Sequence, residues 1–199
     1  MTNYPFAPAI SKGRNPPFVF WENAFTEEEL ESIKEQATAL IVEPGSVNYN
    51  SSAGIRKSVR EAKVSWINYT QESSWLYDRM AGVASSLNAQ FYNFDLHGFV
   101  EEMQFTLYNG EEKSHYTWHV DKTDTAPSTR KLSMVLQLSE PSDYEGGELQ
   151  IWHAVEPVTI SKKKGFIAMF PSYVLHRVTP VTKGVRCSLV VWVAGPAFK

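Results

Sequence analysis

The chain has 199 residues, of which 43% are hydrophobic and 21% are charged, and its net charge is −3. This length can bury one sizeable core and is short for two, so we expect a single domain over residues 1–199. The slightly acidic balance supplies no positive field, which argues against nucleic acid or an acidic membrane surface as a partner.

Cys187 is the only cysteine, so the chain cannot form an internal disulfide, as is typical of a reducing compartment. The N-terminus lacks the charged-then-apolar pattern of a signal peptide, and no apolar run approaches the roughly 20 residues of a membrane span. These features predict a cytoplasmic protein that does not cross a membrane.

The first forty residues predict an arm, a strand and a helix. Residues 1–17 contain four prolines, which indicates an extended segment rather than a folded unit. A short strand is expected at Phe18–Trp21. Thr26 and Glu29 form a capping box, and apolar residues at helical spacing then predict a helix over 27–40.

The next segment, residues 43–63, is rich in Gly, Ser and Asn and carries scattered basic residues. It predicts a long loop or loose hairpin. A short strand at Lys63–Ile67 follows, and apolar residues at steps of three and four then predict a second helix over about 72–92.

After residue 98 the hydrophobic pattern changes to the alternation that is typical of strands. Turn signals separate short strands expected near residues 103–107, 132–138, 149–151, 166–170, 174–178 and 185–193. Helices followed by a run of antiparallel strands predict an α+β, mainly β fold in which the helices buttress a β-sandwich or barrel.

An imidazole and a carboxylate lie two residues apart at His119 and Asp121. On a strand such residues face the same side, so both could bind one ion, although chance matches to this pair are common. His176 lies in a later predicted strand, and two histidines with one carboxylate form a facial triad on an octahedral metal. The remaining histidines are better explained as surface or loop residues: His97, His115 and His153.

Arg186 lies in the apolar predicted strand at 185–193. A permanent cation in a buried strand is costly unless an anion meets it, and a guanidinium suits a bidentate contact with a carboxylate. That carboxylate belongs either to a bound molecule or to an Asp or Glu of the chain.

The C-terminal half resembles a known enzyme family in the order and spacing of its motifs. The matching segments are Tyr108-Asn109-Gly110, Tyr116-Thr117-Trp118-His119-Val120-Asp121, Leu132-Ser133, Leu136-Gln137-Leu138-Ser139, Tyr144-Glu145-Gly146-Gly147-Glu148-Leu149, Pro171-Ser172, Leu175-His176-Arg177-Val178-Thr179-Pro180-Val181-Thr182-Lys183-Gly184-Val185-Arg186 and Val191-Trp192. The chain resembles the Fe(II)/2-oxoglutarate oxygenases, and most of all the small bacterial and phage hydroxylases of the PKHD type in the prolyl-hydroxylase branch. The N-terminal half matches this family only in general features.

The resemblance implies a double-stranded β-helix, or jelly roll, over residues 98–194. Residues 1–97 would supply support helices and a loop on the substrate side. It also implies that the iron ligands are His119, Asp121 and His176.

The resemblance further assigns the co-substrate contacts. Arg186 would bind the distal carboxylate of 2-oxoglutarate, Tyr108 would donate a hydrogen bond to the same group, and Trp192 would close the pocket. Gln137 lies where some relatives carry a second hydrogen-bonding side chain. The side chains expected to contact substrate are Arg56, Tyr116 and Trp118.

Residues 46–60 offer little apolar anchorage and are expected to order over the metal when substrate arrives. In that arrangement the basic residues Arg56, Lys57 and Arg60 would contact the substrate backbone or acidic groups near it. A fixed hairpin packed on the barrel is the alternative.

The activity that the resemblance implies is hydroxylation of an unactivated C–H bond with Fe(II), 2-oxoglutarate and O2, releasing succinate and CO2. A peptidyl proline is the first expected substrate, so a proline-containing peptide or protein is the expected partner, and ascorbate is expected to support the assay. The alternatives are a free amino acid, another small molecule or a nucleobase as substrate, or a jelly roll that binds a partner without catalysis. A cupin-type Zn or Mn protein is the remaining option, although it would not need Arg186 ten residues after His176. The sequence predicts no oligomeric state.

Overall fold

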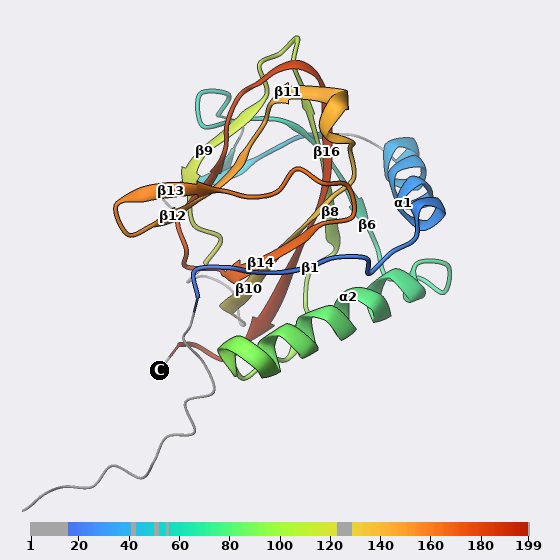
Figure 1. Ribbon diagram of the computed structural model, residues 1–199, viewed down its shortest axis with the longest axis vertical. Coiled ribbons are helices and arrows are strands. Elements are labelled where there is room, and N and C mark those ends of the chain that lie inside the picture. Colours follow the sequence, from blue (N-terminus) through green and yellow to red (C-terminus); the bar gives the residue numbers. More distant parts are fainter. Residues whose placement is uncertain (1–15, 41–42, 50–51, 55, 123–128, 199) are drawn as a thin grey trace, which may run out of the picture.

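Two antiparallel β-sheets face each other, and two helices cover the outer face of the larger sheet (Figure 1). The computed structural model describes residues 16–40, 43–49, 52–54, 56–122 and 129–198. Nearly all of the arm expected at residues 1–17 therefore lies outside the described residues. No helix in the described part of the chain combines the length and the apolar character needed to cross a membrane.

The first helix, α1 (Glu27–Ala39), begins at the expected capping box. The backbone N–H of Thr26 donates to the Glu29 carboxylate at 2.9 Å, and the backbone N–H of Glu29 donates to the Thr26 hydroxyl at 3.3 Å. These two bonds satisfy donors that a helix N-terminus leaves unpaired.

The second helix, α2 (Ser74–Leu87), continues into a π-helical turn, Asn88–Tyr92. The single helix expected over 72–92 therefore changes its hydrogen-bonding pattern in its last turn. The side chain of Asn88 ends it by bonding both the backbone N–H and the carbonyl of Phe94, each at 2.9 Å.

The larger sheet has the strand order β1-β14-β10-β16-β8-β6-β2, and β7 and β11 also pair with β16. Its strands are β1 (Val19–Trp21), β2 (Glu43–Pro44), β6 (Lys63–Ile67), β7 (Gly98–Phe99), β8 (Met103–Asn109), β10 (Thr129–Gln137), β11 (Tyr144–Gly146), β14 (Ile167–Pro171) and β16 (Val181–Gly195). A 3-10 turn, Pro141–Asp143, precedes β11.

The smaller sheet has the order β13-β12-β15-β9-β5. Its strands are β5 (Arg60–Glu61), β9 (His115–His119), β12 (Leu149–His153), β13 (Glu156–Thr159) and β15 (His176–Val178). A separate hairpin joins β3 (Val47–Tyr49) to β4 (Ser52–Gly54). Two facing antiparallel sheets of this kind form the expected jelly roll, and the fold is mainly β with helices on one side.

The two faces of the larger sheet have different roles. Along β16 the residues that join the core beneath the helices are Cys187, Leu189, Val191 and Val193. The alternate residues face the smaller sheet: Arg186, Ser188, Val190 and Trp192. The period of two along one strand thus separates a stabilising apolar face from a face that lines a cavity.

The expectation of a loop or loose hairpin at 43–63 is wrong at both ends of the segment. The β3–β4 hairpin lies within it, but β2 pairs with β6 and β5 pairs with β9, so the segment contributes a strand to each sheet. These strands are two residues long and depend on their partners, so their own sequence carries little strand pattern. Residues 50, 51 and 55 lie outside the described part, and the expected ordering of residues 46–60 over substrate stays a prediction.

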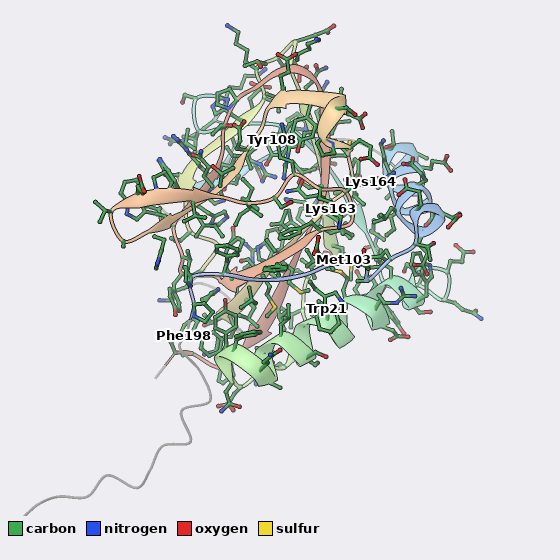
Figure 2. The ribbon with its side chains drawn as sticks, in the orientation of Figure 1. Trp21, Met103, Tyr108, Lys163, Lys164 and Phe198 are labelled. Carbon is green, nitrogen blue, oxygen red and sulfur yellow. The ribbon has the colours of Figure 1, made fainter. Side chains whose placement is uncertain are left out.

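One lysine joins α1 to the turn that precedes β14. The side chain of Lys164 is 7% exposed and forms ion pairs with Glu27 and Glu31 on successive turns of α1 (Figure 2). Buried charges require such partners, so this contact helps to fix α1 against the sheet.

Candidate active site

Two histidines meet where β9 and β15 pair. His119 and His176 are Cα partners in this register, and their ring centroids are 4.1 Å apart. Each Nδ1 donates to a backbone carbonyl two residues earlier, that of Thr117 at 2.7 Å and that of Val174 at 3.0 Å. Because a carbonyl can only accept, the proton of each ring is on Nδ1. The Nε2 of each ring therefore keeps a free lone pair with which it can bind a metal.

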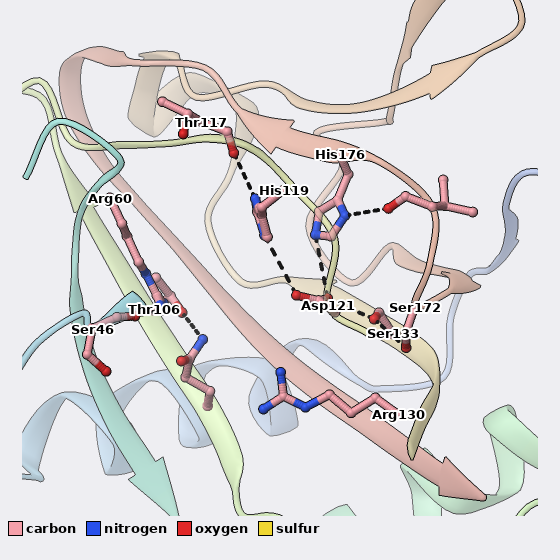
Figure 3. Close-up of polar contacts among 12 residues, drawn as sticks. Ser46, Arg60, Thr106, Thr117, His119, Asp121, Arg130, Ser133, Ser172 and His176 are labelled. Atoms are coloured by element: carbon pink, nitrogen blue, oxygen red, sulfur yellow. Dashed lines mark hydrogen bonds and ion pairs between the residues drawn. The ribbon is translucent and has the colours of Figure 1, made fainter. Parts of the chain in front are cut away.

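Asp121 completes the group from outside the strand (Figure 3). The sequence predicts His119 and Asp121 on one face of a strand, but β9 ends at His119. The backbone N–H of Asp121 instead donates to the Ser172 carbonyl at 2.9 Å, which holds the residue beside the histidines. Its two carboxylate oxygens lie 3.7 Å from the His119 Nε2 and 3.5 Å from the His176 Nε2.

A serine orients the carboxylate. The hydroxyl of Ser133, on β10, donates to Asp121 Oδ2 at 2.7 Å and lies 3.0 Å from the hydroxyl of Ser172. The ligand atoms of His119, Asp121 and His176 all lie within 4.8 Å of one another. Within the described residues no other group of three or more His, Cys, Asp or Glu side chains comes together in this way.

Burial and the close packing of charges tune this group. Burial, followed by the proximity of His176, lowers the pKa of His119 well below its usual value. Burial alone would raise the pKa of Asp121, but the two histidines outweigh it and hold that pKa below its usual range. His119 is therefore neutral and Asp121 ionised at neutral pH, which are the forms that bind a divalent ion.

The group lies in a cavity of about 650 Å³ between the two sheets. The wall on the larger sheet includes Val64, Trp66, Gln104, Tyr108, Val135, Arg186, Ser188, Val190 and Trp192. The wall on the smaller sheet includes Arg60, Tyr116, Trp118, His119, Leu149, His176 and Val178. A cavity of this size can hold a small molecule and part of a second one.

Arg186 extends into this cavity and is only 1% exposed. Its guanidinium donates to the Gln137 side-chain oxygen at 3.0 Å and to the Ser188 hydroxyl at 3.3 Å, and its Nε has no partner. No carboxylate of the described residues forms an ion pair with it, so nothing in that part of the chain neutralises its charge. Gly147 makes room for it, because a Cβ there would lie 3.1 Å from the Arg186 Cδ.

Two of the three other expected co-substrate contacts, Tyr108 and Gln137, lie against Arg186. Tyr108 is its Cα partner across β8 and β16, and the centre of the guanidinium lies 5.3 Å from the Tyr108 ring. Burial raises the pKa of Tyr108, so its hydroxyl keeps its proton and can donate. Gln137 accepts a hydrogen bond from Arg186 but does not line the cavity, whereas Trp192 lines the cavity further along β16.

The expected substrate side chains divide into two sets. Tyr116 stacks on the His119 ring with centroids 3.4 Å apart, and Trp118 packs edge-on against Trp152 at the cavity wall. Arg56 is exposed and does not line the cavity, so a contact between Arg56 and substrate stays a prediction. Arg60, four residues later, does line the cavity.

Sequence reasoning missed several residues of the site. Ser133, Ser172 and Ser188 support the charged groups, yet only the alternation of small polar residues along strands signals their position. Arg130 lies 3.7 Å above the Trp192 ring and pairs with Glu101, and no sequence pattern connects these three positions. Their proximity follows from the pairing of β10 and of β7, which Glu101 follows, with β16.

The remaining histidines lie apart from the group, as expected. His115 faces the turn before β9, where its Nδ1 donates to the Lys113 carbonyl at 3.0 Å. His97 and His153 form no metal-binding group within the described residues.

Comparison with known proteins agrees with this architecture. Residues 103–194 match the 2OG-Fe(II) oxygenase superfamily. A PKHD-type hydroxylase from Shewanella sp. (strain ANA-3) is 30% identical over 178 residues, which cover 85% of this chain and 75% of that protein.

Solved structures show the same fold at lower identity. A Pseudomonas putida prolyl-4-hydroxylase superposes with a TM-score of 0.71 at 20% identity, covering 91% of this chain and 94% of that one. A Trichoplax adhaerens prolyl hydroxylase, solved with a peptide fragment of hypoxia inducible factor, gives 0.71 at 18% identity, covering 92% and 84%. The chain belongs to the 2OG-Fe(II) oxygenase superfamily, in its PKHD-type branch, and is a dioxygenase that uses Fe(II), 2-oxoglutarate and O2.

Proposed function

We propose that this enzyme hydroxylates a prolyl residue of a peptide, with Fe(II) held by His119, Asp121 and His176. The observation that carries the proposal is the buried cluster of two imidazole Nε2 atoms and one carboxylate within 4.8 Å. Both imidazoles are anchored through Nδ1, which fixes their orientation before an ion arrives. These three side chains would hold the ion and would leave room on it for further ligands.

Arg186 binds the distal carboxylate of 2-oxoglutarate in this proposal. The guanidinium of Arg186 is buried, bonds only neutral side chains and forms no ion pair with a carboxylate of the described residues. Such a buried charge favours an anion supplied by a bound molecule. Gln137 and Ser188 hold the guanidinium in place, and the protonated hydroxyl of Tyr108 can donate to the same carboxylate. When bound, iron with 2-oxoglutarate supplies the oxidising chemistry that activates O2 and yields succinate and CO2.

The protein orients the substrate and excludes water from the reacting carbon. Tyr116 and Trp118 form the wall beside His119, and Trp192 forms the opposite wall, so an apolar ring fits between aromatic surfaces. The likeness to prolyl hydroxylases, one of them solved with a peptide, supports a peptidyl proline as the group that enters. A peptide rather than a folded protein domain is the simplest ligand for a cavity of about 650 Å³.

Mass spectrometry tests the substrate directly. Enzyme, Fe(II), ascorbate and 2-oxoglutarate are incubated with a panel of proline-containing peptides, and Asp121→Ala serves as the control. We expect a peptide to gain the mass of one oxygen atom on proline, with an equal amount of succinate, and no gain with the variant. Oxidation of other residues with proline left unmodified would refute the assignment of proline as substrate, and the assignment of dioxygenase activity would still hold.

A further inference from the structure

A second buried guanidinium lines the same cavity. Arg60, on β5, is 7% exposed. Its NH1 donates to the Ser46 carbonyl at 3.2 Å, and its Nε is buried without a hydrogen-bond partner. Within the described residues it forms no ion pair with a carboxylate, so its charge is uncompensated there.

The side chain of Arg60 is held in place without any ligand. Pairing of β5 with β9 makes Arg60 the Cα partner of Tyr116, and the centre of the guanidinium lies 4.8 Å from the Tyr116 ring. Gly45 packs against the other side, where an added Cβ would lie 2.7 Å from the Arg60 Nε. A preorganised donor of this kind loses little entropy when it binds a ligand.

The other two arginines of the cavity each have an observed or a proposed anionic partner, whereas Arg60 has neither. Arg130 pairs with Glu101, and Arg186 faces the position proposed for the distal carboxylate of 2-oxoglutarate. The acidic residues that line the cavity are Asp121, which contacts the two histidines, and Glu43, which is exposed on β2 and forms no ion pair with Arg60. A buried cation in this position favours an anion that enters with the substrate.

We propose that Arg60 binds a carboxylate of the substrate next to the carbon that is hydroxylated. The inference rests on the proposed function, in which Arg186 binds the distal carboxylate of 2-oxoglutarate and leaves Arg60 for the substrate. Arg60 extends toward the space that His119 and Asp121 face, from the opposite side to Ser133 (Figure 3). The carboxylate is either the α-carboxylate of a C-terminal or free residue, or the side chain of an acidic neighbour.

Matched acid and amide probes separate these sources. Protein loaded with Mn(II) and an inert 2-oxoglutarate analogue is titrated calorimetrically with N-acetyl-L-proline and with its amide. A second pair is N-acetyl-prolyl-aspartate amide and N-acetyl-prolyl-asparagine amide. The leucine counterparts of both pairs show whether a preference for the acid exists apart from a preference for proline, so that failure of the proline assignment is distinguishable from failure of this inference.

We expect the acid of at least one pair to bind about 10- to 100-fold more tightly than its amide, as one or two charge-assisted hydrogen bonds provide. Arg60→Gln should abolish this preference, and Arg60→Lys should restore part of it through a point charge. Lys57→Gln is the control, because Lys57, although grouped with Arg60 by the sequence, is an exposed cation that pairs with Glu61 and does not line the cavity.

Affinity for Mn(II) and for the 2-oxoglutarate analogue should be unchanged in both Arg60 variants, which also shows that the site is intact. The inference is overturned if no probe binds, if acid and amide bind equally in every pair, or if the preference survives in Arg60→Gln. A loss of affinity for the 2-oxoglutarate analogue in Arg60→Gln would also overturn it, because Arg60 would then serve the co-substrate.

Discussion

At the scale of single residues, two serines on neighbouring strands support different parts of the site. Ser133 donates to the Asp121 carboxylate at 2.7 Å, whereas Ser188 accepts from Arg186 at 3.3 Å. Both are buried and both face the cavity side of the larger sheet. Replacing each by alanine removes one hydroxyl and little volume, so the pair separates metal binding from co-substrate binding.

Ser133→Ala should weaken Mn(II) binding about tenfold, because residues that orient metal ligands typically contribute that much to affinity. Its affinity for 2-oxoglutarate, measured with metal at saturation, should change little. Ser188→Ala should show the reverse pattern. Calorimetric titration of both variants with both ligands checks this, and equal losses of both affinities in either variant would contradict the division.

Arg186→Met tests whether the role of Arg186 is to bind the anionic co-substrate or to stabilise the fold. We expect the half-saturating concentration of 2-oxoglutarate to rise about 100-fold or more, while Mn(II) affinity is preserved. The metal-free variant should unfold in urea with nearly the same free energy as the natural chain, because a buried cation without a carboxylate contributes little stability. A loss of about 3–5 kcal/mol would instead indicate a structural ion pair.

At the scale of elements, β16 combines stability and function on opposite faces. Leu189 is fully buried beneath the helices, and its neighbour Val190 lines the cavity. Leu189→Ala should lower the free energy of unfolding by about 2–5 kcal/mol, as truncation of core leucines does. Val190→Ala, a truncation one carbon smaller at the next residue, should cost less than half as much.

The same two variants should differ in activity in the opposite sense. Val190→Ala should change the Michaelis constant for substrate, and Leu189→Ala should leave it unchanged below the unfolding temperature. Urea unfolding and initial rates measure the two effects. Similar losses of stability in both variants would contradict the division of β16 into a stabilising core face and a ligand-binding cavity face.

The elements with a strong local pattern could be predicted from the sequence. The capping box at Thr26 locates the start of α1, and the strand expected at Lys63–Ile67 has those bounds in the structure. The short strands β2 and β5 could not be predicted, because two residues carry no period and pair only where a partner edge lies nearby.

The residues of the site likewise divide into those that the sequence predicts and those that only the structure identifies. Spacing and family resemblance single out His119, Asp121, His176 and Arg186, and the structure brings all four to one cavity. The sequence groups Arg60 with Arg56 as substrate contacts, and only the structure separates them, because the pairing of β5 with β9 turns Arg60 into the cavity while Arg56 stays exposed. Which distant strands pair is a long-range property, and a strand of two residues such as β5 carries no pattern that would predict its partner.

At the scale of the whole molecule, the core and the cavity occupy opposite faces of the larger sheet. Ligands that fill the cavity therefore add stability by mass action without repacking the core beneath the helices. Mn(II) with a 2-oxoglutarate analogue, each at about 100 times its dissociation constant, should raise the unfolding temperature by several degrees. Thermal denaturation measures the shift, and Asp121→Ala should lack it.

The central claim is that one iron site, built from His119, Asp121 and His176, converts 2-oxoglutarate to succinate. The most direct measurement is succinate formed by anaerobically prepared protein after addition of Fe(II), 2-oxoglutarate and O2, compared among the natural chain, Asp121→Ala, His176→Ala and Arg186→Met. We predict succinate from the natural chain, none above background from the two ligand variants, and recovery of the Arg186 variant at high 2-oxoglutarate. Undiminished succinate from Asp121→Ala or His176→Ala would contradict the account.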